Sequence, residues 1–148
     1  MSVGGAFYAI DRYRLRGLVI DPSTVSDLIH RPDGPGGPTA SETVEQAWDV
    51  VQTLLPEVVD GEELDGTDGL GCIYLTASHV EHSAARLAHR NVPELVRLFA
   101  SEPARFAELY WAKVWLEDVE ALQEFMEGVQ RFFAAAAARR DAVVFYMA

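Results

Sequence analysis

The fold class is decided by residues 118–146, DVEALQEFMEGVQRFFAAAAARRDAVVFY. Apolar residues recur there at helical spacing and predict a long helix over about residues 118–139, with Arg139 and Arg140 near its end, where positive charge favours the helix dipole. The apolar positions of this helix are Val119, Leu122, Phe125, Met126, Val129, Phe132, Phe133 and Ala136. The apolar run at 142–146 then predicts a C-terminal strand.

Two other short runs predict further strands. Residues 7–10 (FYAI) and 72–75 (CIYL) are rich in aromatic and β-branched side chains. Few strands, several helices and no alternation of the two are typical of an α+β fold. We therefore expect a small sheet of N-terminal, middle and C-terminal strands packed with several helices.

A second helix is predicted by the segment that follows residue 38. Thr39 and Glu42 have the spacing of a capping box, in which each side chain bonds a free backbone N–H of the first turn. The residues after it form one apolar stripe at helical spacing, namely Val44, Ala47, Trp48, Val51, Leu54 and Leu55. The sequence therefore predicts a helix over residues 39–55, ended by Pro56.

Capping residues and prolines mark the other element boundaries. They predict helices over about residues 21–29, 76–90, 93–99 and 101–110, and a Pro- and Gly-rich loop over 32–38. An acidic loop punctuated by glycine is expected between residues 57 and 71.

Length and composition indicate one domain. The chain has 148 residues, the size of a single domain with its own core, and we assign residues 1–148 to one α+β domain. Its one cysteine, Cys72, cannot form an intramolecular disulfide, which favours a reducing compartment. No signal peptide or membrane-spanning apolar stretch is present, so a cytoplasmic protein is expected. Arginine outnumbers lysine eleven to one, which is typical of a GC-rich bacterial genome.

The charge is confined to one third of the chain. The net charge is −11, and residues 32–85 contain eleven acidic residues but no lysine or arginine. The negative potential of this segment repels phosphate backbones, which argues against nucleic-acid binding. The same potential attracts a basic protein. The candidate partner-binding residues are Glu57, Asp60, Glu62, Glu63, Asp65 and Asp68. A loop that is simply solvated, or a Ca²⁺ site, is an alternative for this segment, although no register matches an EF-hand.

Aromatic residues define a second candidate site. Trp111 and Trp115 are four residues apart, which would place them on one helical face, and Tyr110 and Trp48 complete a candidate pocket. Such side chains usually belong to a core, but they can also line a groove for a ligand.

No motif indicates catalysis, a metal or a cofactor. His79, His82 and His89 share a predicted helix with Arg86, whose charge opposes metal binding, so a solvated helix face is expected. Cys72 lies in an apolar strand, where an inert buried thiol is expected. The glycines between residues 66 and 71 lack the lysine of a phosphate-binding loop.

Several short motifs, taken in order, resemble one family. Residues 43–55 (TVEQAWDVVQTLL) are similar to the Asp-Ile-Asp-Lys-Ala-Trp-His-x-x-His-x-Leu-Leu segment of the YfbM-like family of small bacterial domains of unknown function. The opening Phe7-Tyr8, the segment Tyr74-Leu75-Thr76, residues 111–115 (WAKVW) and the closing helix and strand resemble it too. Thr43, Asp49 and Gln52 replace the family's acid and two histidines, and Ala112 replaces a proline. The resemblance implies a compact α+β monomer or small homo-oligomer, and it implies no reaction.

These observations favour a non-catalytic binding protein over an enzyme. The expected function is engagement of a basic protein partner by an acidic surface, of which toxin neutralisation (an immunity-type role) is one form. An enzyme or small-molecule-binding protein with an aromatic pocket near Trp48, Trp111 and Trp115 is the alternative. A scaffold whose charge serves only solubility is the third possibility.

Overall fold

The computed structural model describes residues 2–30 and 36–148. Its centre is a five-stranded antiparallel sheet with the order β2-β1-β5-β4-β3. The strands are β1 (Gly5–Ile10), β2 (Ala40–Glu45), β3 (Glu62–Glu63), β4 (Gly71–Leu75) and β5 (Ala142–Met147). The C-terminal strand therefore lies in the middle of the sheet, between the N-terminal strand and β4.

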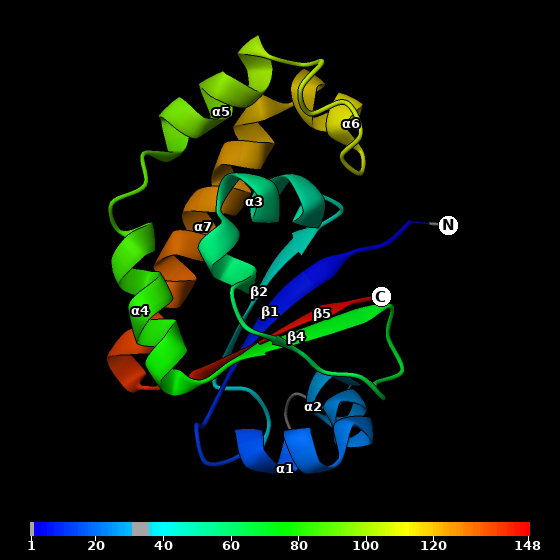
Figure 1. Ribbon diagram of the computed structural model, residues 1–148, viewed down its shortest axis with the longest axis vertical. Coiled ribbons are helices and arrows are strands. Elements are labelled where there is room, and N and C mark those ends of the chain that lie inside the picture. Colours follow the sequence, from blue (N-terminus) through cyan, green and yellow to red (C-terminus); the bar gives the residue numbers. More distant parts are fainter. Residues whose placement is uncertain (1, 31–35) are drawn as a thin grey trace.

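Helices cover both faces of this sheet (Figure 1). They are α1 (Leu15–Ile20), α2 (Val25–His30), α3 (Trp48–Leu54), α4 (Ala77–Leu87), α5 (Val92–Ser101), α6 (Ala112–Glu117) and α7 (Val119–Arg139), with 3₁₀ turns η1 (Pro22–Thr24) and η2 (Pro56–Val59). The short helices α1 and α2 lie on one face, and α3 to α7 lie on the other. An α+β fold with strands from the three expected regions is thus confirmed.

The two faces of the sheet contain separate hydrophobic cores. The larger core packs α3 to α7 against the sheet and includes Phe7, Phe133 and Phe145, all at most 1% exposed. The Phe7 ring centroid lies 5.7 Å from that of Phe133 and 4.8 Å from that of Phe145. The smaller core packs α1 and α2 against the opposite face, through residues such as Leu18 and Leu28.

The strongest sequence predictions are confirmed. The predicted C-terminal helix and strand are α7 and β5, and Asp118 caps α7 by accepting a hydrogen bond from the backbone N–H of Ala121. Thr76 caps α4 by accepting one from the N–H of His79, although α4 ends at Leu87 rather than near residue 90. Strands β1 and β4 include the two short runs predicted as strands.

The prediction of one helix over residues 39–55 is wrong for its first half. Residues 40–45 form β2 instead, and only α3, from residue 48 to residue 54, is helical. The Thr39 hydroxyl does not cap a helix, because it donates to a carboxylate oxygen of Asp141 at 2.6 Å and its backbone N–H donates to the Ala9 carbonyl. Pairing with β1 outweighs the local capping pattern.

Two other boundaries also differ. Residues 103–111 form turns rather than the predicted helix, and the helix there, α6, begins only at Ala112. The predicted helix over residues 21–29 is split into η1 and α2. Most of the loop predicted at 32–38 lies outside the described residues. In the described ranges, no helix has the length and apolar character needed to cross a membrane.

Candidate functional site

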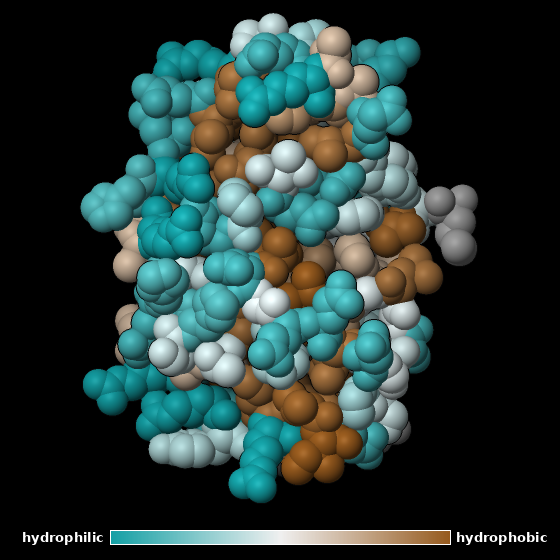
Figure 2. Space-filling view, in the orientation of Figure 1, coloured by the Kyte–Doolittle hydropathy of each residue, from teal (hydrophilic) through white to brown (hydrophobic). Residues whose placement is uncertain are grey.

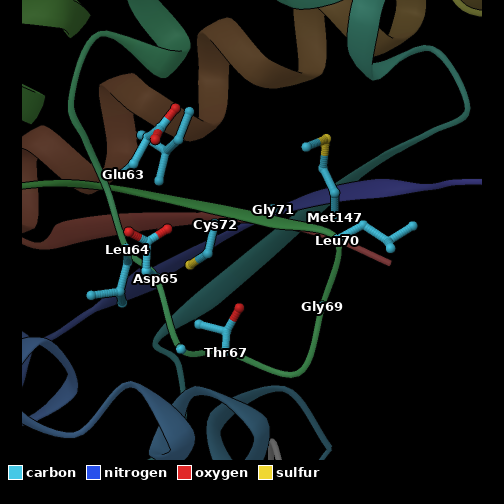
Figure 3. Close-up of a pocket in the computed structure, with 11 residues that line it drawn as sticks. Glu63, Leu64, Asp65, Thr67, Gly69, Leu70, Gly71, Cys72 and Met147 are labelled. Atoms are coloured by element: carbon cyan, nitrogen blue, oxygen red, sulfur yellow. The ribbon is translucent and has the colours of Figure 1, made fainter.

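The acidic segment extends along one edge of the sheet. After η2 the chain forms the two-residue strand β3 against β4, leaves the sheet edge, and returns at Gly71 (Figure 3). The carboxylates of this segment that are exposed to solvent are those of Asp60, Glu62, Glu63, Asp65 and Asp68. We call these five residues the acidic loop. Five of the six predicted partner-binding residues thus share one exposed edge.

A cavity of about 310 Å³ lies between the acidic loop and the start of β4. Glu63, Asp65 and Thr67 contribute polar groups to its lining, and Leu64 and Met147 contribute apolar ones. In Figure 3, Glu63 lies at one end of the cavity and Met147 at the other. The cavity therefore combines two carboxylates with an apolar wall.

Tyrosine hydroxyls hold two of the loop carboxylates. The Tyr74 hydroxyl donates to Glu62 at 2.5 Å, and the Tyr146 hydroxyl donates to Asp68 at 2.7 Å. The hydrogen bond from Tyr146 lowers the pKa of the Asp68 carboxyl. Burial, and then that same bond, raises the pKa of Tyr146 to about 12. The contact between Tyr146 and Asp68 therefore favours a charged Asp68 and a neutral Tyr146.

Within residues 2–30 and 36–148, no lysine or arginine forms an ion pair with the acidic loop. The two charged contacts of the loop are with histidines, His79 at 3.4 Å from Asp60 and His30 at 4.0 Å from Asp68. The loop carboxylates are therefore left without a lysine or arginine counter-charge among the described residues.

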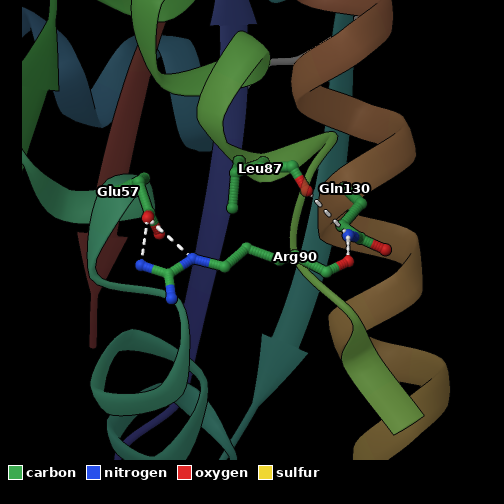
Figure 4. Close-up of polar contacts among 4 residues, drawn as sticks. All are labelled: Glu57, Leu87, Arg90 and Gln130. Atoms are coloured by element: carbon green, nitrogen blue, oxygen red, sulfur yellow. Dashed lines mark hydrogen bonds and ion pairs between the residues drawn. The ribbon is translucent and has the colours of Figure 1, made fainter. Parts of the chain in front are cut away.

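Glu57 does not belong to this surface, which corrects its prediction as a partner-binding residue. Its side chain is 2% exposed and faces inward from η2. One oxygen, Oε1, accepts hydrogen bonds from Nε and Nη2 of Arg90, while Oε2 has no partner among the described residues (Figure 4). Gln130 of α7 fixes the same turn by donating to the carbonyls of Leu87 and Arg90. Glu57 is thus part of a structural network.

Cys72 lines the cavity but has the character of an inert thiol. It is 5% exposed, and burial raises its pKa to about 12. A thiol at such a pKa is almost entirely protonated at neutral pH, and the protonated form is a poor nucleophile. The structure therefore gives Cys72 a packing role.

The four candidate pocket aromatics do not form a common pocket wall. The rings of Trp48 and Tyr110 stack at 5.5 Å between centroids, and those of Tyr110 and Trp111 stack at 5.8 Å. Trp115 is buried and meets the Phe125 ring edge to face, so Trp111 and Trp115 do not share an exposed face. The helix begins between them, at Ala112, which is why the four-residue spacing misleads. None of these four residues lines the cavity behind the acidic loop.

The three histidines predicted on one helix do not share it. His79 lies on α4 beside Asp60, His82 is exposed on α4, and His89 is exposed beyond the end of α4 at Leu87. In the part of the chain that the structure describes, no three His, Cys, Asp or Glu side chains are grouped closely enough to hold a metal ion.

The fold and these surfaces define a class of small α+β domain with a central antiparallel sheet between two helical layers. A family model described as "Domain of unknown function (DUF1877)" matches residues 1–146, and the chain belongs to this family. The crystal structure of YfbM from Escherichia coli, a protein of unknown function, has the same fold, with a TM-score of 0.71. The match covers 98% of this chain and 99% of that one at 13% sequence identity. No curated protein matches the chain in sequence. The resemblance to YfbM-like domains is therefore confirmed.

Proposed function

We propose that this protein is a non-catalytic binding protein whose acidic loop engages a basic protein partner. The observation that carries the proposal is the exposed run of carboxylates at one sheet edge, which has no lysine or arginine partner within the described ranges. Uncompensated charge of one sign raises the local concentration and association rate of an oppositely charged partner.

The cavity behind the acidic loop suits a lysine or arginine side chain of that partner. Such side chains bury their aliphatic stem on apolar surface and keep the charged head near polar groups. Here Leu64 and Met147 offer the apolar wall, and Glu63 and Asp65 offer the carboxylates. A volume of about 310 Å³ is at the lower end of the range for small-molecule pockets, which also fits one inserted side chain.

A cytoplasmic location and a toxin-neutralising role belong to this proposal. The buried, unpaired thiol of Cys72 is compatible with a reducing compartment. An acidic protein can neutralise a basic protein by covering its charged surface. The negative charge on the rest of the chain also disfavours acidic proteins as partners. The aromatic alternative has less support, because its rings pack on one another.

A capture experiment with matched variants tests the proposal. The protein is immobilised and exposed to lysate of its own source cell, beside a loop variant (Glu62→Gln, Glu63→Gln, Asp65→Asn). The control variant removes the same charge from the exposed α6–α7 region (Glu117→Gln, Glu120→Gln, Glu124→Gln). We expect the wild type and the control to retain one basic protein that the loop variant loses, and that elutes as salt is raised.

Specific outcomes contradict the proposal. Equal retention by the loop variant and the control variant would show that net charge alone is responsible. Retention of a neutral or acidic protein would exclude charge complementarity at this edge. Circular dichroism of each variant before capture excludes misfolding as the cause of a loss.

A further inference from the structure

A groove of about 500 Å³ lies on the other helical layer, between α1 and the junction of β4 with α4. Its lining includes Leu15, Val19 and Ile20 from α1, and Tyr74 with Thr76 from the β4–α4 junction. Most of its exposed lining is apolar. It is separate from the acidic loop cavity, with which it shares no lining residue.

The rim of this groove carries unusually exposed apolar side chains. Ile20 is 72% exposed and Tyr13 is 76% exposed, although α1 already buries Leu15 and Leu18 in the smaller core. Figure 2 shows apolar surface gathered over α1 at the lower end of the molecule. Large exposed apolar side chains that adjoin a groove are typical of interaction sites rather than of ordinary solvated surface.

The charge of the groove is opposite to that of the molecule. Arg12 and Arg16 line it and no aspartate or glutamate does, whereas the whole chain has 23 acidic and 12 basic residues. Arg12 lies over the Tyr13 ring at 4.7 Å, and neither arginine forms an ion pair within residues 2–30 and 36–148. Thr76, Ala77 and Ser78 add the positive end of the α4 dipole. The opposing charges around the groove are those of Asp11 and Glu81, which act on Arg12 from outside ion-pair range, and that of Glu62, which accepts a hydrogen bond from Tyr74 of the lining.

We infer that this groove docks a segment of a partner protein in which apolar side chains are flanked by aspartate or glutamate. The apolar floor would take the apolar anchors, and Arg12, Arg16 and the start of α4 would face the carboxylates. Arginine and tyrosine at the rim of an apolar groove are the residue types that dominate binding energy at protein interfaces. The inference goes beyond the proposed function, because the surface, its charge and its partner all differ.

Charge also decides between this occupant and two others. A second copy docked symmetrically through α1 would bring the two sets of arginines together, which like charges oppose. A wide anionic bilayer would meet the net charge of −11 of the whole chain and be repelled, whereas a short segment meets only the local charge of the groove. A segment with apolar side chains flanked by acidic ones complements both the apolar floor of the groove and its positively charged rim.

Selection from a random peptide library displayed on phage tests the inference with the folded protein as bait. Two groove variants, Ile20→Ser and Arg16→Glu, alter exposed side chains only. Their matched controls are Val114→Ser and Arg97→Glu, which make the same kinds of change on α6 and α5, far from the groove lining. The strongest selected peptide is synthesised, and its affinity for each protein is measured by fluorescence anisotropy.

We expect enriched peptides that combine Leu, Ile, Phe or Trp with Asp or Glu, and a roughly tenfold or greater loss of affinity in each groove variant, as for interface anchors. The controls should bind within about twofold of the wild type. An absence of groove-dependent peptides, or equal binding by all variants, would overturn the inference. Basic peptides that are lost only in the acidic loop variant would support the proposed function, and their selection without any groove-dependent peptide would overturn the groove inference.

The other occupants have outcomes of their own. Light scattering that shows a dimer abolished by Ile20→Ser would replace the inference with self-association. Co-sedimentation with phosphatidylcholine–phosphatidylglycerol vesicles, lost in the same variant, would replace it with membrane contact. A monomer that ignores these vesicles and binds acidic, apolar peptides supports it.

Discussion

Glu57 and Arg90 form a buried charge network that depends on both partners. The carboxylate of Glu57 is 2% exposed, one of its oxygens accepts both arginine hydrogen bonds, and the other has no partner among the described residues. Removing one member of such a pair leaves an uncompensated buried charge. Replacing both members with apolar residues removes the charge together with its desolvation cost.

We therefore expect Arg90→Leu to lower the free energy of unfolding by about 3 kcal/mol, at the low end of the usual range because the Arg90 side chain is 35% exposed. The double variant Glu57→Leu/Arg90→Leu should lose less than this single variant. Urea denaturation of both proteins measures the difference, with Arg97→Leu on the exposed face of α5 as the control. A double variant less stable than Arg90→Leu would show that the attraction within the Glu57–Arg90 pair outweighs the cost of burying its charges.

At the level of elements, the end of α7 is held by a left-handed residue that is not glycine. Arg140 has φ of 60°, and the N–H groups of Arg140 and Asp141 donate to the carbonyls of Ala137 and Ala136. This is the Schellman arrangement, in which glycine is normally preferred because a Cβ atom is strained there.

Arg140→Gly should therefore raise the free energy of unfolding by about 0.5–1 kcal/mol, the strain relief being partly offset by the greater freedom of glycine in the unfolded chain. Arg140→Ala removes the same charge but keeps the strained Cβ, so it should differ from the wild type by no more than about 0.5 kcal/mol. Thermal and urea unfolding of both variants measure these changes. Equal effects of glycine and alanine would attribute the result to charge rather than to backbone conformation.

The elements also show what the sequence could predict. Helix α7 is long enough for its period to outweigh local ambiguity, and Asp118 and Thr76 cap helices as local chemistry predicts. Strand β2 was missed because Thr39 and Glu42 imitate a capping box and Val44 happens to continue the apolar stripe of α3. The structure instead shows the alternation of a strand, because residues 41, 43 and 45 are exposed while Val44 is buried. Pairing with β1, a long-range contact, decided between the two patterns.

The candidate sites also differ in how far the sequence predicts them. The acidic loop was predictable because charge is additive along a continuous segment, but the burial of Glu57 was not, since it depends on the approach of Arg90 from the connection between α4 and α5. The shared helical face predicted for Trp111 and Trp115 is absent, because helix α6 begins only after Trp111. The groove of Arg12, Arg16 and Ile20 has little sequence signal, because its other wall comes from residues about 55–60 positions later.

On the scale of the whole molecule, the net charge of −11 must cost stability, because the folded state brings its carboxylates closer together than the unfolded chain does. The ion pairs formed by lysine or arginine within the described ranges involve Glu57, Glu102 and Asp141, and none involves the acidic loop. Screening by salt should therefore stabilise the fold rather than weaken it. The Debye length falls from about 30 Å at 0.01 M to about 8 Å at 0.15 M, which spans the distances across a domain of this size.

We expect the free energy of unfolding in urea to rise as NaCl increases over that range, and to rise less steeply in the variant Glu62→Gln, Glu63→Gln, Asp65→Asn. The loop variant should itself be more stable than the wild type at low salt, with the difference disappearing as salt is added. The variant Glu117→Gln, Glu120→Gln, Glu124→Gln is the matched control, since it removes equal charge from a region that also contains Lys113. Its salt dependence should stay closer to that of the wild type. A salt dependence that is flat, or that all three proteins share, would mean that the acidic loop is too well solvated to repel itself, and the attraction proposed for a basic partner would lose the same electrostatic basis.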